Sequence, residues 1–180
     1  LYEKWIGQIL DAAGDRYDEV RLYAFSDHGM ANCDRHLDLM AKLKELPFKF
    51  GVDYVAVYDS TMARFWFLKN GVREVIADAL KKIPEGRIMR EDELKELRAY
   101  FADNRFGELI FLMDEGVLIV PSHMGERPIR AMHGYHPSAP QSYAAIFSNQ
   151  ELPESVRAIP HIYNLMTREA GEAKRLNHRA

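Results

Sequence analysis

A short apolar run, residues 20–25, ends abruptly at the polar tetrapeptide Ser-Asp-His-Gly of residues 26–29. Helical periodicity precedes this run in residues 2–13, where Gly14 is placed to end the helix, and it follows the tetrapeptide from about Asp34 to Leu46. This order of elements, a helix, a buried strand, a polar turn and another helix, is typical of an open α/β sheet. We therefore predict an α/β fold, with this strand in the sheet.

The middle of the chain, residues 48–118, is predicted to form an inserted α+β cap. Strands are expected at 52–58 and 64–68 around a turn at 59–61, followed by a helix over 72–83, a short strand at 87–89 and a helix over about 91–101. Two apolar runs, 109–113 and 117–120, flank Asp-Glu-Gly and predict a hairpin.

The sequence pattern of residues 119–180 is similar to that of the first segment, residues 1–47. They contain an aperiodic loop at 122–140, a strand at 144–147 and a helix after Pro160. Long aperiodic loops inside compact domains are usually functional. The predicted organisation is therefore a core made of residues 1–47 and 119–180, with residues 48–118 inserted as the cap.

Composition excludes several classes of protein. The 24 Lys and Arg are offset by 27 Asp and Glu, a balance that argues against a nucleic-acid surface. The single cysteine, Cys33, excludes an internal disulfide framework, and it is more typical of a reducing compartment such as the cytoplasm, although exported proteins can also have few cysteines. The longest apolar runs are far shorter than the roughly 20 residues that span a bilayer, so no membrane segment is expected.

Asp27 and His28 are the first candidates for chemistry. They lie just past the carboxyl end of the predicted strand, where open α/β sheets place their ligands. A carboxylate beside an imidazole suits a zinc-like divalent ion, and Gly29 allows tight backbone there. The alternative is a capped turn in which Asp27 accepts backbone hydrogen bonds and His28 lies on the surface.

A second candidate group is His-Gly-Tyr-His-Pro at residues 133–137, within the aperiodic loop. His133 lies 105 residues beyond His28, and a metal bound by two distant segments is normal for a catalytic site on a scaffold. The alternative is a loop whose histidines only form hydrogen bonds.

Together these segments resemble a known family. Phe-Ser-Asp-His-Gly-Met at residues 25–30, followed by His-Gly-Tyr at 133–135, is similar to the alkaline phosphatase superfamily, and most similar to its type I phosphodiesterase/nucleotide pyrophosphatase branch. Pro-His-Ile-Tyr-Asn-Leu-Met at 160–166 also looks like a helix near the end of that catalytic domain. The resemblance implies the C-terminal part of an alkaline phosphatase-like open sheet with flanking helices, carrying the inserted cap.

The resemblance also implies two divalent metal ions of the zinc type. Asp27 and His28 match the adjacent pair that binds one ion, and His133 matches a histidine that binds the other. The implied reaction is displacement at phosphorus by a metal-activated Thr or Ser. The family's nucleophile and its Asp-x-x-x-His pair precede the first motif, and no Asp in this chain has a His four residues later. The catalytic residue is therefore expected on an upstream half of the same catalytic domain.

The function expected from the resemblance is hydrolysis of phosphodiester or pyrophosphate bonds in a small-molecule phosphoester or nucleotide. Alternatives are another reaction of the superfamily, such as phosphonate hydrolysis, phosphotransfer or phosphomonoester hydrolysis, or a non-catalytic interaction domain with vestigial motifs. His136 stands where relatives often carry Asp, and it is either a substrate-binding residue or a solvent-exposed loop histidine.

Other residues have weaker claims. Asp-Ser-Thr at 59–61 has the types of a nucleophile site but is expected to be a turn. The aromatic residues 65–67 are expected to form buried cap core, the alternative being that they help cover a base or another organic group if the cap closes over the site. Cys33 is expected to be a small core residue. No partner is predicted for His36 or His123, and His178 lies in the C-terminal tail.

Overall fold

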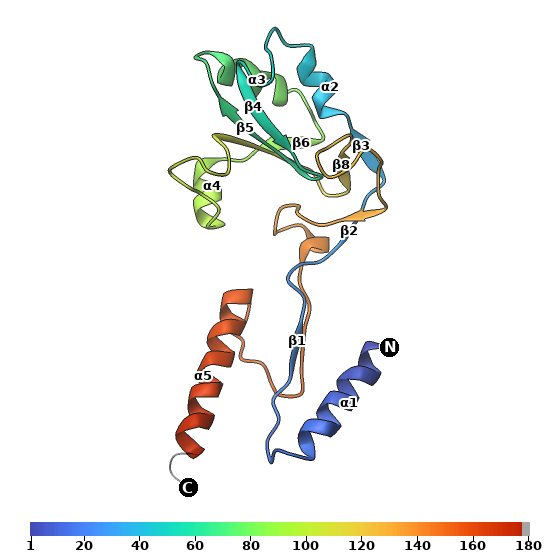
Figure 1. The fold of residues 1–180 in the computed structure, drawn as a ribbon, viewed down its shortest axis with the longest axis vertical. Helices are drawn as coiled ribbons and strands as arrows, with labels where there is room; N and C mark the ends of the chain where they lie inside the picture. The colour runs from blue at the N-terminus through green and yellow to red at the C-terminus, as the bar shows by residue number, and fades with distance from the viewer. Residues whose placement is uncertain (178–180) are drawn as a thin grey trace. The chain divides into compact units, whose positions relative to one another are not determined.

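The computed structural model of the chain describes residues 1–177 (Figure 1). It divides into two compact units, one comprising residues 1–27 and those from 144 onward, and the other comprising residues 28–143. Across the described residues, we find no helix with both the length and the apolar character that a bilayer crossing requires.

The first unit is built around an antiparallel strand pair. β1 (Tyr23–Phe25) pairs with β10 (Ile146–Ser148), so that Phe25 lies opposite Ile146, and Figure 1 shows the two strands side by side in blue and orange. The Asn149 side chain extends the pairing, because it accepts a hydrogen bond from the Leu22 amide at 2.8 Å and donates one to the Val20 carbonyl at 2.9 Å.

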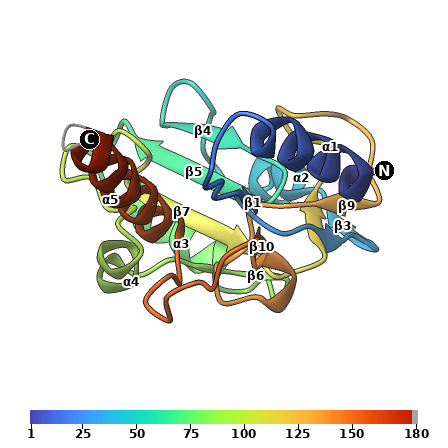
Figure 2. The same ribbon diagram turned by 90° about the horizontal axis from the view of Figure 1, so that it is seen from below.

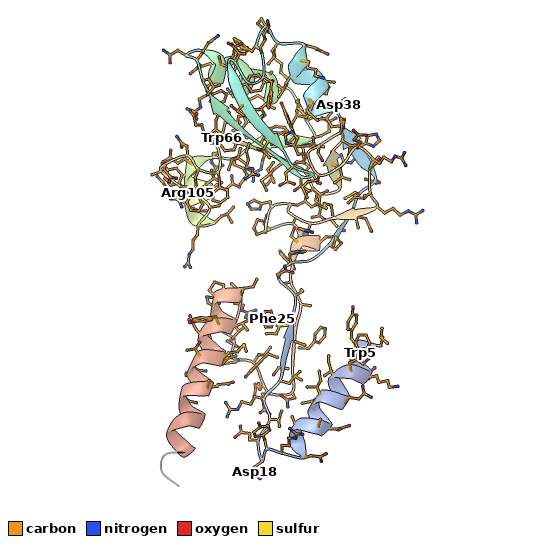
Figure 3. All side chains as sticks on the ribbon, in the orientation of Figure 1. Trp5, Asp18, Phe25, Asp38, Trp66 and Arg105 are labelled. Atoms are coloured by element: carbon orange, nitrogen blue, oxygen red, sulfur yellow. The ribbon has the colours of Figure 1, made fainter. Side chains whose placement is uncertain are left out.

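Two helices complete this unit, α1 (Tyr2–Gly14) and α5 (Ile159–Asn177). The Tyr23 hydroxyl donates to Glu169 at 2.7 Å, which ties β1 to α5. Both helices confirm the sequence predictions, as does the strand near 146. The expectation of a buried strand over 20–25 is wrong: only three residues are extended, and Phe25 is 45% exposed. Figure 3 labels the Phe25 side chain. As far as the described residues go, β1 belongs to a two-stranded sheet, which is too narrow to bury it.

The core of the second unit is a four-stranded antiparallel sheet in the order β4-β5-β7-β6 (Figure 2). Its strands are β4 (Tyr54–Tyr58), β5 (Met62–Phe67), β6 (Gly86–Ile88) and β7 (Leu109–Met113). The register places Ala56 opposite Phe65, and Phe111 opposite Ala63. These residues share a core cluster with Ile76 of α3 (Val72–Leu80), whose apolar face recurs at helical spacing.

Two short helices flank this sheet. α2 (Leu39–Lys44) begins at Asp38, whose carboxylate accepts a hydrogen bond from the Ala41 amide at 2.8 Å and caps the helix (Figure 3). α4 (Glu91–Glu96) is shorter than predicted, because the chain turns at Arg98, where φ is +56°. All four strands and α3 lie within residues 48–118, and the assignment of that segment as an inserted cap stays a prediction.

Two predictions in this unit are wrong. The runs at 109–113 and 117–120 form no hairpin: β7 pairs with β5 and β6, whereas β8 (Val117–Ile119) pairs in parallel with β3 (Arg35–Leu37). The helix expected from Asp34 begins only at Leu39, because β3 occupies the preceding residues. In both places, pairing between distant segments overrides a local pattern.

The loop predicted over 122–140 contains one short regular element. β9 (Ala131–Met132) pairs antiparallel with β2 (Ala31–Asn32), and a 3₁₀ turn, η1 (Pro140–Ser142), follows. This small ladder joins the two segments that carry the candidate residues.

Candidate functional site

The imidazole rings of His28 and His133 stack face to face. Their centroids are 3.9 Å apart and their planes differ by 19°. Both residues belong to the second unit, although 105 residues separate them along the chain. The structure therefore brings together the two segments that the sequence analysis expected to meet.

The β2–β9 ladder explains this convergence. Ala31 pairs with Met132, and the Cys33 amide donates to the Arg130 carbonyl at 2.8 Å, so the chain just after His28 runs antiparallel to the chain just before His133. Backbone pairing of this kind fixes the register of the two segments and hence the proximity of the two rings.

Gly29 allows a very close backbone approach beside His28. Its amide donates to the Ser142 carbonyl at 3.0 Å. A Cβ atom at this position would lie 2.1 Å from the Gln141 carbonyl oxygen and 2.7 Å from that of Tyr143. Only glycine fits there, in agreement with the expectation of tight backbone after His28.

The protonation of the His28 ring follows from its neighbour. Its Nδ1 lies 2.7 Å from the Gly29 carbonyl oxygen. A carbonyl can only accept, so Nδ1 carries the proton and the neutral ring has its lone pair on Nε2. Metal-ligating histidines commonly have this arrangement, with one nitrogen donating to a carbonyl and the other directed to the ion.

The loop that carries His133 is fixed on its far side by Gly134 and Tyr135. Gly134 has φ of +92°, and its carbonyl accepts a hydrogen bond from the buried Thr61 hydroxyl at 3.0 Å. The Tyr135 hydroxyl is also buried and donates to the Val117 carbonyl at 3.1 Å, with the Cys33 sulfur 3.2 Å away. Burial raises the pKa of Tyr135, and its contact with the Cys33 thiol raises it further. His133 itself remains exposed.

His136 is half-buried, with 26% of its side chain exposed, and the choice between a substrate-binding residue and a solvent-exposed loop histidine stays open. Its Nδ1 contacts the Ser138 hydroxyl at 2.6 Å, and its Nε2 lies 3.1 Å from Glu93 of α4. This Nε2 atom is buried, and its N–H does not point along the line to the carboxylate, so the contact is close but poorly aligned. Sequence reasoning missed Glu93, which is one of three acidic residues at the start of a helix.

Several other residues considered in the sequence analysis are buried, half-buried or hydrogen-bonded within the fold. Thr61 and Ser60 lie buried in the turn between β4 and β5, as expected, and the Thr61 hydroxyl is engaged by Gly134. Cys33 is half-buried. His123, for which no partner was predicted, accepts a hydrogen bond from the Tyr58 amide at 3.2 Å.

The aromatic residues of β5 and the remaining histidines are described by their burial and contacts. Phe65 is fully buried, as expected of cap core, while the Trp66 indole donates to the Asn104 carbonyl at 2.7 Å (Figure 3 labels Trp66). His36 is exposed on β3. His178 lies outside the described residues.

No group of three or more His, Cys, Asp or Glu side chains that could hold a metal ion occurs within residues 1–177. The stacked pair supplies two imidazoles, and Asp27 is an exposed residue of the first unit. The metal-binding role expected of Asp27, His28 and His133 stays a prediction at this point.

Comparison with known proteins supplies the family. Residues 2–136 match the family described as type I phosphodiesterase / nucleotide pyrophosphatase. No curated protein sequence matches the chain significantly.

Solved structures share the fold. Murine ectonucleotide pyrophosphatase / phosphodiesterase 5 superposes with a TM-score of 0.62 at 22% identity, over 81% of this chain and 37% of that one. An inactive variant of the same murine protein in complex with AMP gives a TM-score of 0.60. Phosphonoacetate hydrolase from Sinorhizobium meliloti, in complex with phosphonoformate, gives 0.59 at 17% identity, over 84% of this chain and 40% of that one.

The chain thus spans less than half the length of these structures, and its fold is a partial alkaline phosphatase-like α/β fold. The family match covers most of the chain and includes both halves of the histidine pair. The chain belongs to the type I phosphodiesterase/nucleotide pyrophosphatase family.

Proposed function

We propose that this chain is the C-terminal part of the catalytic domain of a metal-dependent phosphoesterase that hydrolyses phosphodiester or pyrophosphate bonds. The observation that carries the proposal is the stacking of His28 on His133 at 3.9 Å. This contact brings together the histidines of the two segments that carry the resemblance to the family.

The donor set fits two divalent ions. We infer that Asp27 and His28 hold one ion and that His133 holds the other. His28 and His133 would each offer one ring nitrogen to an ion, and because their rings lie 3.9 Å apart the two residues could hold neighbouring ions. Nitrogen and carboxylate oxygen donors are typical of zinc, the metal that we propose.

Two bound cations would supply the charge that lowers the pKa of the nucleophile and neutralises the attacking and leaving oxygens. This chain's own contribution is to orient the two imidazoles. The Nδ1 proton of His28 is held by the Gly29 carbonyl, and the loop of His133 is held by the β2–β9 ladder. The first contact sets which nitrogen of His28 carries a lone pair, and the ladder sets the backbone position of His133.

The remaining ligands and the Thr or Ser nucleophile are proposed to lie on an upstream half of the same catalytic domain, because none of the chain's aspartates has the family's Asp-x-x-x-His spacing. The substrate is proposed to be a small-molecule phosphoester or nucleotide. The family and the AMP complex of the murine relative support this class. Phosphonate hydrolysis is the second candidate, supported by the fold shared with phosphonoacetate hydrolase.

The test uses the protein expressed from its full reading frame, with a chromogenic phosphodiester, a phosphomonoester and phosphonoacetate as substrates. Addition of Zn²⁺ is expected to raise phosphodiester hydrolysis, and a chelator to abolish it. His28→Ala and His133→Ala should each reduce kcat/KM by about 100-fold or more, whereas His36→Ala, an exposed histidine of β3, should change it little.

Activity that survives both histidine substitutions, or that ignores the chelator, would refute the proposal. A preference for phosphonoacetate would favour the second candidate instead. The 180-residue chain alone is expected to bind Zn²⁺ weakly and to show negligible turnover, so robust hydrolysis by it would contradict the placement of the nucleophile. The substrate-binding role expected of His136 stays a prediction, and its ring contacts favour the role argued next.

A further inference from the structure

The segment 48–118 contacts each of the three residues that follow His133. Thr61, at the start of β5, donates to the Gly134 carbonyl at 3.0 Å, and Glu93, in α4, lies 3.1 Å from Nε2 of His136. Between them, the Tyr135 hydroxyl donates to the carbonyl of Val117, in the same segment, at 3.1 Å. The three residues that follow His133 are therefore each held by a contact with a residue of the cap segment, namely Thr61, Val117 and Glu93.

Glu93 is suited to a fixed contact of this kind. Its side chain is only 13% exposed, and Arg87 of β6 donates to its carboxylate through two nitrogens, one of them at 2.7 Å. Arg87 lowers the pKa of Glu93 to about 2, so the carboxylate stays charged at any physiological pH. The charge that faces His136 is therefore permanent, and a bidentate partner limits its movement.

The Nε2 atom of His136 lies beside this carboxylate, 3.1 Å from its nearer oxygen, although the two are poorly aligned. The Ser138 amide donates to Nδ1 at 3.2 Å, so Nδ1 carries a lone pair. In the neutral ring the proton is then on Nε2, the buried atom that lies 3.1 Å from Glu93. Ser138 and Glu93 together specify one tautomer and one ring orientation.

We propose that Glu93 is a positioning residue, which holds His136 and, through the backbone of residues 134–136, sets the orientation of the His133 imidazole. The inference rests on the proposed function in one respect, namely that His133 is a metal ligand. It gives the cap segment a role at the metal site itself, in addition to any contact with substrate. Mutation of a side chain that orients a metal ligand without binding the metal commonly lowers metal affinity by 10–100-fold.

The test compares Glu93→Gln with Glu91→Gln in the 180-residue chain. Glu91 is a matched control, because it lies on the same helix but is 62% exposed and pairs with Lys95. Histidine ring signals are recorded by NMR without metal. Glu93→Gln is expected to shift the signals of both His136 and His133, Glu91→Gln to shift neither, and Glu93→Asp to restore part of the wild-type pattern. Thermal unfolding of each variant verifies that it is folded.

A second pair of variants guards against an indirect effect. In a His136→Gln background, Glu93→Gln is expected to leave the His133 signals unchanged, because the contact between Glu93 and the His136 ring is already absent. If Glu93→Gln moves His136 but not His133, or still moves His133 in the His136→Gln background, the positioning role is wrong.

Co²⁺ serves as a separate probe of the metal site. It is expected to perturb the His28 and His133 signals of the wild-type chain and to bind Glu93→Gln about 10-fold more weakly. Equal Co²⁺ affinity of the two chains overturns the positioning role. Absence of any Co²⁺ effect at His28 and His133 overturns the proposed function instead, whereas the metal-free spectra still decide the role of Glu93.

Discussion

Thr61 donates its hydroxyl proton to the carbonyl oxygen of Gly134 at 3.0 Å, across 73 residues of sequence. The Thr61 side chain is 3% exposed, so water cannot replace this bond if it is lost. The pairing connects the start of β5 with the residue after His133. Thr61 has the hydroxyl of a nucleophile, but that hydroxyl is engaged in a structural hydrogen bond.

Thr61→Val should reduce the free energy of unfolding by about 1–2 kcal/mol. Valine has the shape of threonine but lacks the hydroxyl that donates to the Gly134 carbonyl, so this part-buried hydrogen bond is lost. Thr61→Ser keeps the hydroxyl and should recover most of the hydrogen-bond contribution. Urea unfolding of the two variants measures the difference, and equal loss in both would show that the bond contributes nothing.

Gly134→Ala should destabilise the chain by about 1–3 kcal/mol and should alter the His133 ring signals. The residue has φ of +92°, and a Cβ atom would lie 2.7 Å from the Thr61 hydroxyl oxygen. Gly125→Ala is the control, because a Cβ atom there meets nothing within 4 Å. Denaturant unfolding gives the energies, and a Gly134→Ala variant as stable as Gly125→Ala would contradict the described loop geometry.

The buried Tyr135 hydroxyl predicts loss of stability at alkaline pH. Burial raises its pKa above the ordinary value of 10.0, so the unfolded chain releases the phenolic proton first. Its contribution to stability is therefore fully present below about pH 10 and falls as pH rises from there. Tyr135→Phe should lower the free energy of unfolding by about 1 kcal/mol at pH 7 and should also flatten its decline above pH 10.

Tyr143→Phe provides the comparison for that experiment. Tyr143 is 63% exposed, and its hydroxyl lies a long 3.4 Å from the Ser138 carbonyl. Its removal should change neither the stability at pH 7 nor the alkaline slope. Unfolding curves at pH 8, 9, 10 and 11 decide between the two variants, and identical slopes would count against burial of the Tyr135 hydroxyl.

At acid pH, Glu93 should make the free energy of unfolding fall as pH decreases, the opposite direction to the effect of Tyr135. Its pKa falls from 4.5 to about 2 because Arg87 donates hydrogen bonds to the carboxylate. As pH falls, the unfolded chain takes up this proton first. The contribution of Glu93 to stability is thus complete above about pH 4.5 and is lost as pH falls towards 2. Wild type should be more stable than Glu93→Gln at pH 7, and the difference should shrink through this window.

The free energy of unfolding at pH 7, 5, 4 and 3 measures this convergence. Glu91→Gln should track wild type throughout, since Glu91 is exposed and its pair with Lys95 contributes little. A constant difference between wild type and Glu93→Gln across all four pH values would mean that the charge of Glu93 is not involved.

Local patterns predicted much of the fold because several elements are specified by their own spacing. α3 buries Val72, Ile76 and Leu80 at positions that the apolar periodicity marks, and β4 and β5 follow from alternating residues around a polar turn. The predicted hairpin at Asp114 failed for the converse reason. The partner of β8 is β3, about eighty residues earlier, and no local pattern encodes that pairing.

The candidate site shows the same division. The tripeptides that contain His28 and His133 were distinctive enough to predict that they meet, and the rings do stack. Glu93 and Thr61 were not singled out as contacts of this loop, because their significance depends on where the strands place them. A single acidic residue among three at a helix start has no pattern of its own.

The parallel pairing of β3 with β8 has a consequence for engineering this protein. Parallel neighbours run in the same direction, so the chain leaves Leu37 at one end of the pair and enters Val117 at the other. A tight turn cannot bridge those ends, and a crossover of about a dozen residues is the minimum. The intervening segment therefore cannot be excised and sealed like a surface loop, and any shortened version needs a designed return path along the whole pair.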